Sequence, residues 1–174
     1  MPGIAAIRQA RKALDDVGKT GEITLVYAGG IRNGADVAKA LALGADGIAI
    51  GTAAMVALNC NKEIPGVTDY EGTVGVPAGY CYHCHTGLCP VGVATQNPEL
   101  RKRLDPDEAA VRVYNFLHTL TIECQMFARA CGKTNVHSLE PEDLAALTME
   151  ASAMAMVPLA GTQHTVGRPD MDRY

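Results

Sequence analysis

The stretch that decides the fold is Val26-Tyr-Ala-Gly-Gly-Ile-Arg-Asn-Gly-Ala-Asp-Val-Ala-Lys-Ala-Leu-Ala-Leu-Gly-Ala-Asp-Gly-Ile-Ala-Ile-Gly-Thr-Ala-Ala54. It contains the end of an apolar, β-rich run that starts at Ile23, and a second such run, Gly47-Ile-Ala-Ile50. Continuous apolar runs of this kind are typical of strands buried on both faces of a parallel sheet. Between them, Asn33 is a suitable N-cap for a helix over residues 34–43, and a short helix follows the second run. The predicted order is β-α-β-α.

Both predicted strands end in glycine just before a helix begins, at Gly29-Gly30 and at Gly51-Thr52. Glycine lets an oxyanion approach the main chain, and the free amides of a helix's first turn supply donors. Phosphate is the natural ligand of such a turn, and eight-stranded α/β barrels bind phosphate in the loops after their last two strands. Arg32 is a candidate phosphate contact, although a solvated surface charge is an equal alternative. Glycines also serve simple turns.

A second informative stretch is Cys81-Tyr-His-Cys84-His-Thr-Gly-Leu-Cys89-Pro90, which holds three of the six cysteines of the chain. Thiolates at these spacings can converge on one inorganic centre, and Gly87 allows the sharp turn between them, so an iron–sulfur cluster is the first interpretation. A structural zinc site with His83 or His85 as fourth ligand is an alternative. A disulfide framework fits less well, because Met-Pro-Gly leads into an amphipathic stretch instead of a secretory signal.

The composition is that of a mildly acidic globular protein. Of 174 residues, 48% are hydrophobic, and 15 basic against 19 acidic side chains give a net charge of -4. A nucleic-acid surface would need a clustered basic face, and no apolar run approaches the ~20 residues of a membrane span, so neither partner is expected. We expect a cytoplasmic protein with a core of aliphatic side chains, since only 5% of residues are aromatic.

The remaining segments read as scaffold. We expect a helix near residues 3–17, a long helix that begins after the N-cap Asp105, and a third helix after Pro141. Apolar residues recur at helical spacing along the long helix, so its cysteines are assigned to the core. They are Val113, Phe116, Leu117, Leu120, Cys124, Phe127 and Cys131. The histidines His118, His137 and His164 are expected at the surface or in capping positions.

The two informative stretches resemble a known family. The first is similar to the last two barrel strands of many FMN-dependent enzymes. The second, Cys84-His-Thr-Gly-Leu-Cys-Pro-Val-Gly-Val-Ala-Thr-Gln-Asn-Pro-Glu-Leu-Arg-Lys-Arg103, closely resembles the FMN and iron–sulfur domain of glutamate synthase large subunits. The resemblance covers residues 3–160. It implies an α/β chain comprising the last strands of a (β/α)8 TIM barrel (1–59), an iron–sulfur loop region (60–104), C-terminal helices (105–160) and a tail (161–174).

The resemblance also implies cofactors. FMN phosphate would contact Gly29, Gly30, Gly51 and Thr52, with Arg32 as a further contact. A 3Fe-4S cluster would be held by three cysteines, which carry over to Cys60, Cys84 and Cys89. This chain departs from the pattern by the segment Asn61–Tyr80 and by an additional thiol, Cys81, which together allow a 4Fe-4S cluster. No residue is assigned a catalytic role.

The activity that the resemblance implies is reductive formation of glutamate from 2-oxoglutarate and nitrogen from ammonia or glutamine. The long segment before Cys81 is also similar to the glutamate-synthase-like subunit of methylamine-glutamate N-methyltransferase (N-methylglutamate synthase), which is a second reading. A free-standing iron–sulfur electron-transfer subunit and a zinc-stabilised interaction module are further alternatives.

The chain is too short to form a complete eight-stranded barrel. A full barrel takes ~250 residues, so we expect a missing N-terminal barrel portion or a partner subunit, together with glutaminase-type and electron-donor subunits. The segment alone is expected to be inactive.

Overall fold

The computed structural model describes residues 2–60, 68–75, 77 and 80–167, and the chain divides into two compact units. One unit comprises Met1–Ile50 and Thr119–Tyr174, and the other comprises Gly51–His118. The predicted insertion over 61–80 and the predicted tail over 161–174 therefore lie partly outside the described residues. The four-part domain plan stays a prediction.

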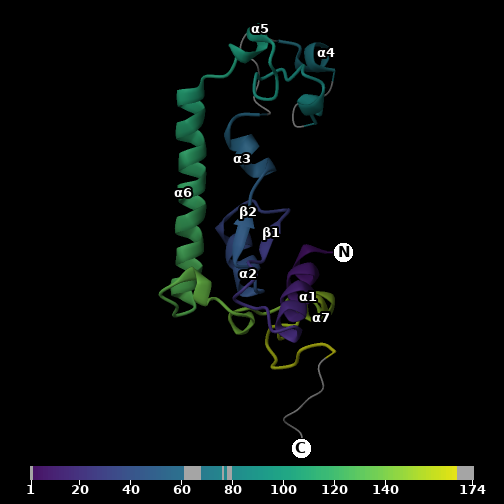
Figure 1. Ribbon diagram of the computed structural model, residues 1–174, viewed down its shortest axis with the longest axis vertical. Helices are drawn as coiled ribbons and strands as arrows, with labels where there is room; N and C mark the ends of the chain where they lie inside the picture. The colour runs from purple at the N-terminus through teal and green to yellow at the C-terminus, as the bar shows by residue number, and fades with distance from the viewer. Residues whose placement is uncertain (1, 61–67, 76, 78–79, 168–174) are drawn as a thin grey trace, which may run out of the picture. The chain divides into compact units, whose positions relative to one another are not determined.

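The first unit contains the predicted parallel sheet. Strand β1 (Val26–Ala28) pairs with strand β2 (Gly47–Ala49) in parallel, with Tyr27 opposite Ile48, and helix α2 (Gly34–Ala42) connects them (Figure 1). Asn33 caps α2 as expected, because its side-chain oxygen accepts a hydrogen bond from Asp36 N at 3.0 Å. This part of the chain is α/β, and the predicted element order is confirmed.

The prediction that these strands are buried on both faces is wrong for the structure as it stands. Val26 is 55% exposed, and Ala28 and Ala49 are also exposed. The physical reason is that, within the described residues, β1 and β2 form a two-stranded sheet and pair only with each other. An apolar strand of this kind needs further strands or helices on both faces to be buried.

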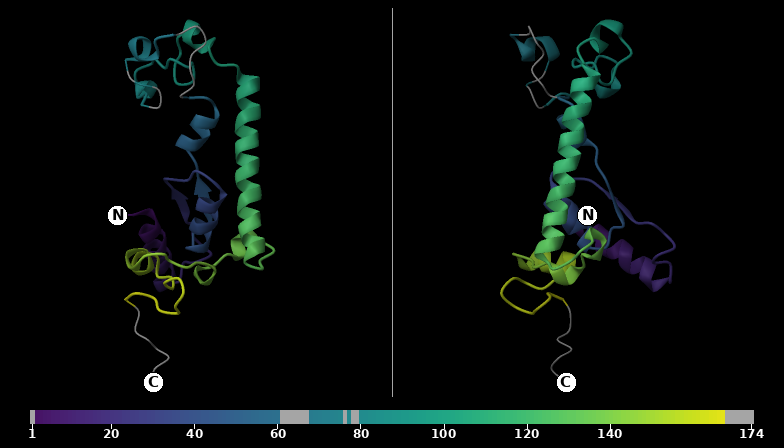
Figure 2. Two further views of the ribbon diagram at one scale, coloured as in Figure 1. Left: turned by 180° about the vertical axis from the view of Figure 1, so that it is seen from behind. Right: turned by 90° about the vertical axis from the view of Figure 1, so that its left-hand side faces the viewer.

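The core of the first unit lies where α2 meets α1 (Gly3–Asp16) and α7 (Met149–Ala155). Helices α1 and α7 lie side by side in both views of Figure 2. Seven buried residues form the cluster, namely Ile7, Ala40, Leu43, Ala45, Ala146, Ala155 and Val157. Ser152 is fully buried there, but its hydroxyl donates to Val157 O at 2.7 Å and accepts from Val166 N at 3.1 Å, so burial leaves its hydroxyl satisfied.

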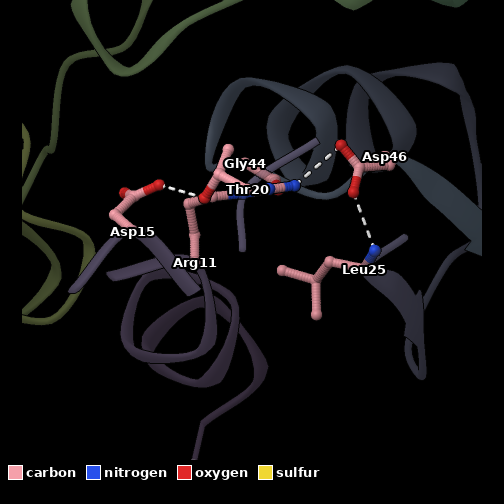
Figure 3. A network of polar contacts seen from close by, with 6 residues as sticks. All are labelled: Arg11, Asp15, Thr20, Leu25, Gly44 and Asp46. Atoms are coloured by element: carbon pink, nitrogen blue, oxygen red, sulfur yellow. Dashed lines mark hydrogen bonds and ion pairs between the residues drawn. The ribbon is translucent and has the colours of Figure 1, made fainter. Parts of the chain in front are cut away.

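A polar network ties α1 to the loop before β2 (Figure 3). Arg11 donates to Gly44 O from Nε at 2.8 Å and from Nη2 at 2.6 Å, and Nη2 also lies 2.7 Å from a carboxylate oxygen of Asp46. The other Asp46 oxygen accepts from Leu25 N at 2.7 Å. The hydrogen bond from Leu25 and then that from Arg11 lower the pKa of Asp46 below its ordinary value. The network holds in place the residues that directly precede both strands, Leu25 and Asp46.

Helix α6 (Pro106–Ala130) begins as predicted, since Asp105 accepts hydrogen bonds from Asp107 N at 3.0 Å and Glu108 N at 3.2 Å. Its buried stripe is narrower than expected. Leu120 and Cys124 are buried, whereas Phe127 is 46% exposed and Leu117 is 41% exposed. Cys131 is also exposed, so its assignment to the core is wrong, because it follows the last helical residue and lies beyond the stripe.

Close packing of α2 on α6 within the first unit depends on Gly34. A Cβ there would lie 2.5 Å from Leu120 O and 2.6 Å from Cys124 N. Gly34 N donates to a carboxylate oxygen of Glu123 at 2.7 Å, which satisfies an N-terminal amide of α2.

After α6 come two short 3-10 turns, Val136–Ser138 and Pro141–Asp143. The third helix begins later than predicted, at Met149, because Thr148 provides its N-cap. His118, His137 and His164 are exposed, as expected. No described helix has both the length and the apolar character that a membrane span requires.

The second unit holds short elements joined by loops. They are α3 (Thr52–Ala57), α4 (Tyr70–Val74), the 3-10 turn η1 (His83–His85), α5 (Pro98–Arg101) and the first part of α6 (Figure 1). Asn97 caps α5 by accepting from Glu99 N at 2.9 Å and Leu100 N at 3.3 Å. The cysteine-rich stretch runs through this unit.

Candidate metal centre

Cys60 follows α3 closely, after the C-cap Leu58 and Asn59. Its amide donates to Met55 O at 3.0 Å, and the preceding Asn59 adopts a left-handed φ of 70°. With the Asn59 amide oriented so that its oxygen faces Arg112, that oxygen accepts from Arg112 Nε and Nη2 at 3.0 Å each. Arg112 is itself 3.1 Å from a carboxylate oxygen of Glu108. The start of α6 thereby holds the residue before Cys60 in place.

Cys89 is the most firmly held of the cysteines in this unit. It is 4% exposed and forms an apolar cluster with the buried residues Val74 and Val91. The main chain that follows is fixed as well, because Arg103 Nη1 donates to Pro90 O at 2.9 Å. The Cys89 sulfur therefore has a well-defined position.

The turn after Cys89 requires a glycine. Gly92 has a φ of 83°, and a Cβ there would overlap the carbonyl oxygen of Leu100. Its amide donates to Cys89 O at 3.2 Å, which closes the turn. The Thr95 hydroxyl donates to Gly87 O and so links the residues after Cys89 to those before it. The turn and this side-chain hydrogen bond thus hold the loop on both sides of Cys89.

Cys81 and Cys84 differ in their environment. Cys81 is half-buried and packs against the cluster around Cys89, whereas Cys84 is exposed within η1. An exposed thiol between half-buried and buried ones is accessible to an incoming metal or cluster. The two thiols therefore differ in their access to solvent.

The Cys60 thiol is affected by its burial and by the three other cysteines of this unit. Burial raises the pKa of Cys60 above its ordinary value, and the negative charges of Cys84, Cys89 and Cys81 raise it further, in that order. The residues that the structure describes nevertheless contain no ready-made group of three or more His, Cys, Asp or Glu ligands. A bound metal would stabilise the negative charges of the four thiolates.

One further observation fits a metal centre in this loop. His83 Nδ1 is buried and has no hydrogen-bond partner among the described residues, although most buried polar atoms in proteins have one. The sequence placed His83 only among alternative zinc ligands. Its position between Cys81 and Cys84 is visible in the sequence, but its burial is not. The donor set of thiols with one orphaned nitrogen suits a soft transition metal or an iron–sulfur cluster.

The two predicted phosphate loops belong to different units. Gly29 and Gly30 have φ of 126° and 69°, which favour glycine, and a Cβ at Gly30 would meet open space. Two amides at the start of α2 are already used, because Gly34 N and Asp36 N donate to Glu123 and Asn33. A phosphate at this end would therefore rely on the glycine loop.

The side chain of Arg32 is 80% exposed and lies 3.3 Å from Asp36, so the surface alternative is favoured there. At the other loop, Gly51 precedes α3 and has no side-chain cap, and a Cβ there would also meet open space. Thr52 is the first residue of α3. Each glycine loop leaves its main chain accessible to a ligand.

Comparison with known proteins gives a consistent result. A family model described as "Conserved region in glutamate synthase" matches residues 1–134. The chain is 55% identical over 168 residues to a glutamate synthase large subunit-like protein of Rhizobium meliloti, and this match covers 97% of the chain and 38% of that relative.

Two less similar relatives are also named as glutamate synthases. The chain is 43% identical over 134 residues to the archaeal glutamate synthase [NADPH] of Methanocaldococcus jannaschii, covering 77% of the chain and 23% of the relative. It is 32% identical over 134 residues to the glutamate synthase [NADPH] large chain of Bacillus subtilis, covering 76% of the chain and 7% of the relative. The chain thus spans well under half the length of each of these relatives.

Proposed function

The chain belongs to the glutamate synthase family, and from this premise we propose that it forms the part of an FMN- and iron–sulfur-dependent oxidoreductase that carries the cluster and the last two barrel strands. The observation that supports the proposal most directly is the gathering of Cys60, Cys81, Cys84 and Cys89 in one compact unit, with Cys60 affected by the charges of the other three. When bound, the cluster would carry electrons and FMN would deliver hydride to an imine of 2-oxoglutarate.

The residues of this chain have distinct proposed tasks. Cys60, Cys84 and Cys89 hold the cluster, and Cys81 is available as a fourth thiolate for a 4Fe-4S form. The apolar surroundings of Cys89 limit the access of water to that side of the centre. Low water access and hydrogen bonds to the sulfurs set the potential of such a centre.

The flavin is proposed to bind at the carboxyl ends of the strands, where parallel barrels carry their active sites. Gly29 and Gly30 follow β1, and Gly51 and Thr52 follow β2. We propose that the main chain at each of these loops donates to the FMN phosphate. Arg32 is retained only as a weaker contact, because Asp36 already neutralises it.

The exposed strands support a further part of the proposal. A two-stranded parallel sheet with Val26 55% exposed is expected where neighbouring strands complete a barrel. We propose that the remaining barrel strands and most of the substrate pocket come from a further segment or a partner subunit, with glutaminase-type and electron-donor proteins acting beside it. The 174 residues alone would then show no synthase activity.

The experiment that tests the proposal is cofactor analysis followed by turnover. The chain is co-expressed anaerobically with the remainder of the barrel, and bound flavin is released and identified by chromatography. The reduced assembly is then mixed with 2-oxoglutarate and with ammonia, glutamine or methylamine in separate reactions. Glutamate from ammonia or glutamine is the expected product. N-methylglutamate formed only with methylamine would point instead to the N-methyltransferase branch.

Two controls make the test specific. Cys84→Ser should abolish cluster-dependent turnover while leaving flavin bound, because the phosphate loops lie elsewhere in the sequence. Cluster without flavin would support a free-standing electron-transfer subunit. Zinc in place of iron and sulfide, together with no flavin, would support an interaction module and overturn the proposal.

A further inference from the structure

His83 lies in the sequence between two of the cysteines proposed to hold the cluster, Cys81 and Cys84, and its ring is fixed at one nitrogen. Nε2 lies 2.7 Å from the carbonyl oxygen of Val74, which is the last residue of α4. Because α4 ends there, with Gly75 in the left-handed region, this carbonyl is one of the acceptors that a helix leaves unpaired at its C-terminus. The ring of His83 also stacks on that of Tyr82, with centroids 5.1 Å apart.

The hydrogen bond determines what the other nitrogen can do. A carbonyl oxygen only accepts, so Nε2 must carry the hydrogen and donate it. In the neutral ring this leaves Nδ1 with a lone pair and no hydrogen. Nδ1 is buried without a partner among the described residues, and leaving a buried polar atom unsatisfied destabilises the fold. A ligand that accepts this lone pair would remove this destabilisation.

We propose that His83 Nδ1 is a nitrogen ligand of the same metal centre that the cysteines hold, in a 4Fe-4S form in which Cys60, Cys84 and Cys89 hold three irons and His83, in place of Cys81, holds the fourth. Metal-bound histidines commonly donate their second ring nitrogen to a backbone carbonyl, which fixes the tautomer and the direction of the lone pair. Val74 O supplies that contact here. Ligation uses the free lone pair, so no bond to hydrogen breaks and no redox step is involved. The inference rests on the proposed function, since it requires an iron–sulfur centre in this loop.

The loop contains a natural control. His85 lies two residues further along, in the same 3-10 turn, but it is exposed, and neither of its ring nitrogens is among the buried atoms without a partner. The two histidines share sequence context and differ in burial. The sequence treats them as equivalent, whereas the structure assigns the ligand role to His83 only.

The test is pulsed EPR of the anaerobically purified protein in whichever redox state is paramagnetic, with iron and acid-labile sulfide measured on each sample. We expect a directly coordinated nitrogen signal that changes from the 14N to the 15N pattern when histidine is labelled with 15N. The signal should persist in His85→Ala and disappear in His83→Ala. If His83→Ala fails to retain iron, His83→Cys should retain it through a thiolate and still lack the nitrogen signal.

Different failures have different meanings. Iron and sulfide without a coordinated nitrogen signal, or a signal that persists in the His83 variants, would overturn the ligand assignment and leave the proposed function intact. A weak coupling that depends on an exchangeable proton would also overturn it, because His83 would then donate a hydrogen bond to a sulfur. Absence of iron and sulfide from the wild type would overturn both the inference and the proposed function.

Discussion

Replacing Gly92 by alanine tests whether this position needs glycine because a Cβ would overlap the main chain of α5, and not only because its φ is left-handed. Gly92 closes the turn after Cys89 with a φ of 83°, and a Cβ there would approach Leu100 O closer than 3.0 Å and lie 3.2 Å from the Arg101 Cα. Both neighbours belong to the main chain of α5, which cannot move aside as a flexible side chain would. Gly87 offers a matched control, since its φ is 75° and a Cβ there would meet nothing within 4 Å.

The expected magnitudes follow from these contacts. The left-handed conformation costs an alanine roughly 1–2 kcal/mol, and the smaller entropy of the unfolded chain returns about 0.4–1 kcal/mol. Overlap with the main chain adds about 1–3 kcal/mol at Gly92 only. We therefore expect Gly92→Ala to destabilise this loop by about 1–4.5 kcal/mol, and Gly87→Ala by no more than about 1.5 kcal/mol.

Hydrogen exchange measured by mass spectrometry on peptides from residues 87–103 is the suitable assay, because it reports on this loop independently of the first unit. Gly92→Ala should speed exchange in these peptides about 5-fold or more beyond the effect of Gly87→Ala, since an overlap of about 1 kcal/mol or more applies at Gly92 only and each 1.4 kcal/mol is tenfold, and it should lower the iron content. Equal changes in hydrogen exchange for Gly92→Ala and Gly87→Ala would refute the reasoning, because overlap with the main chain at Gly92 would then cost no stability.

Three further predictions concern the first unit. Gly34→Ala should lower the free energy of unfolding by about 1–3 kcal/mol in urea titration, because its Cβ would meet the α6 main chain; a change below 0.5 kcal/mol would count against that packing. Asp46→Asn should cost about 0.5 kcal/mol. Since the native pKa of Asp46 is lowered, this difference is complete above the ordinary Asp pKa of about 3.9 and shrinks as the pH falls through the native value. If the stability difference between the wild type and Asp46→Asn grew as the pH fell, the lowered pKa of Asp46 would be contradicted. A maleimide should label exposed Cys131 rapidly and buried Cys124 slowly in the native protein; equal rates would contradict the assigned burial.

Local signals in the sequence predicted several helix starts and the parallel strand pair well. Asn33 caps α2, Asp105 caps α6, and the strands around Tyr27 and Ile48 pair in parallel as the apolar runs indicated. These features depend on residues within a few positions of one another. The sequence also singled out the four thiols that the structure gathers in one unit.

The errors have a different origin, because they depend on contacts between distant residues. Helical spacing assigned Cys131 to the core, but the buried side of α6 is set by the approach of Gly34, which hydrogen-bonds to Glu123 across 89 positions. The contact from His83 to Val74 O depends on where α4 ends, which spacing among the cysteines does not indicate. Exposure of β1 follows from the number of strands available to pair with it.

The central claim is that the second unit holds an iron–sulfur centre through its cysteines. The most direct measurement is iron, zinc and acid-labile sulfide in anaerobically purified protein, with EPR before and after reduction by dithionite, in the wild type, in Cys84→Ser and in the exposed control Cys131→Ser. We predict iron with an equivalent amount of sulfide in the wild type and in Cys131→Ser, and loss of both in Cys84→Ser. Zinc without sulfide, or iron and sulfide unchanged in Cys84→Ser, would contradict the claim.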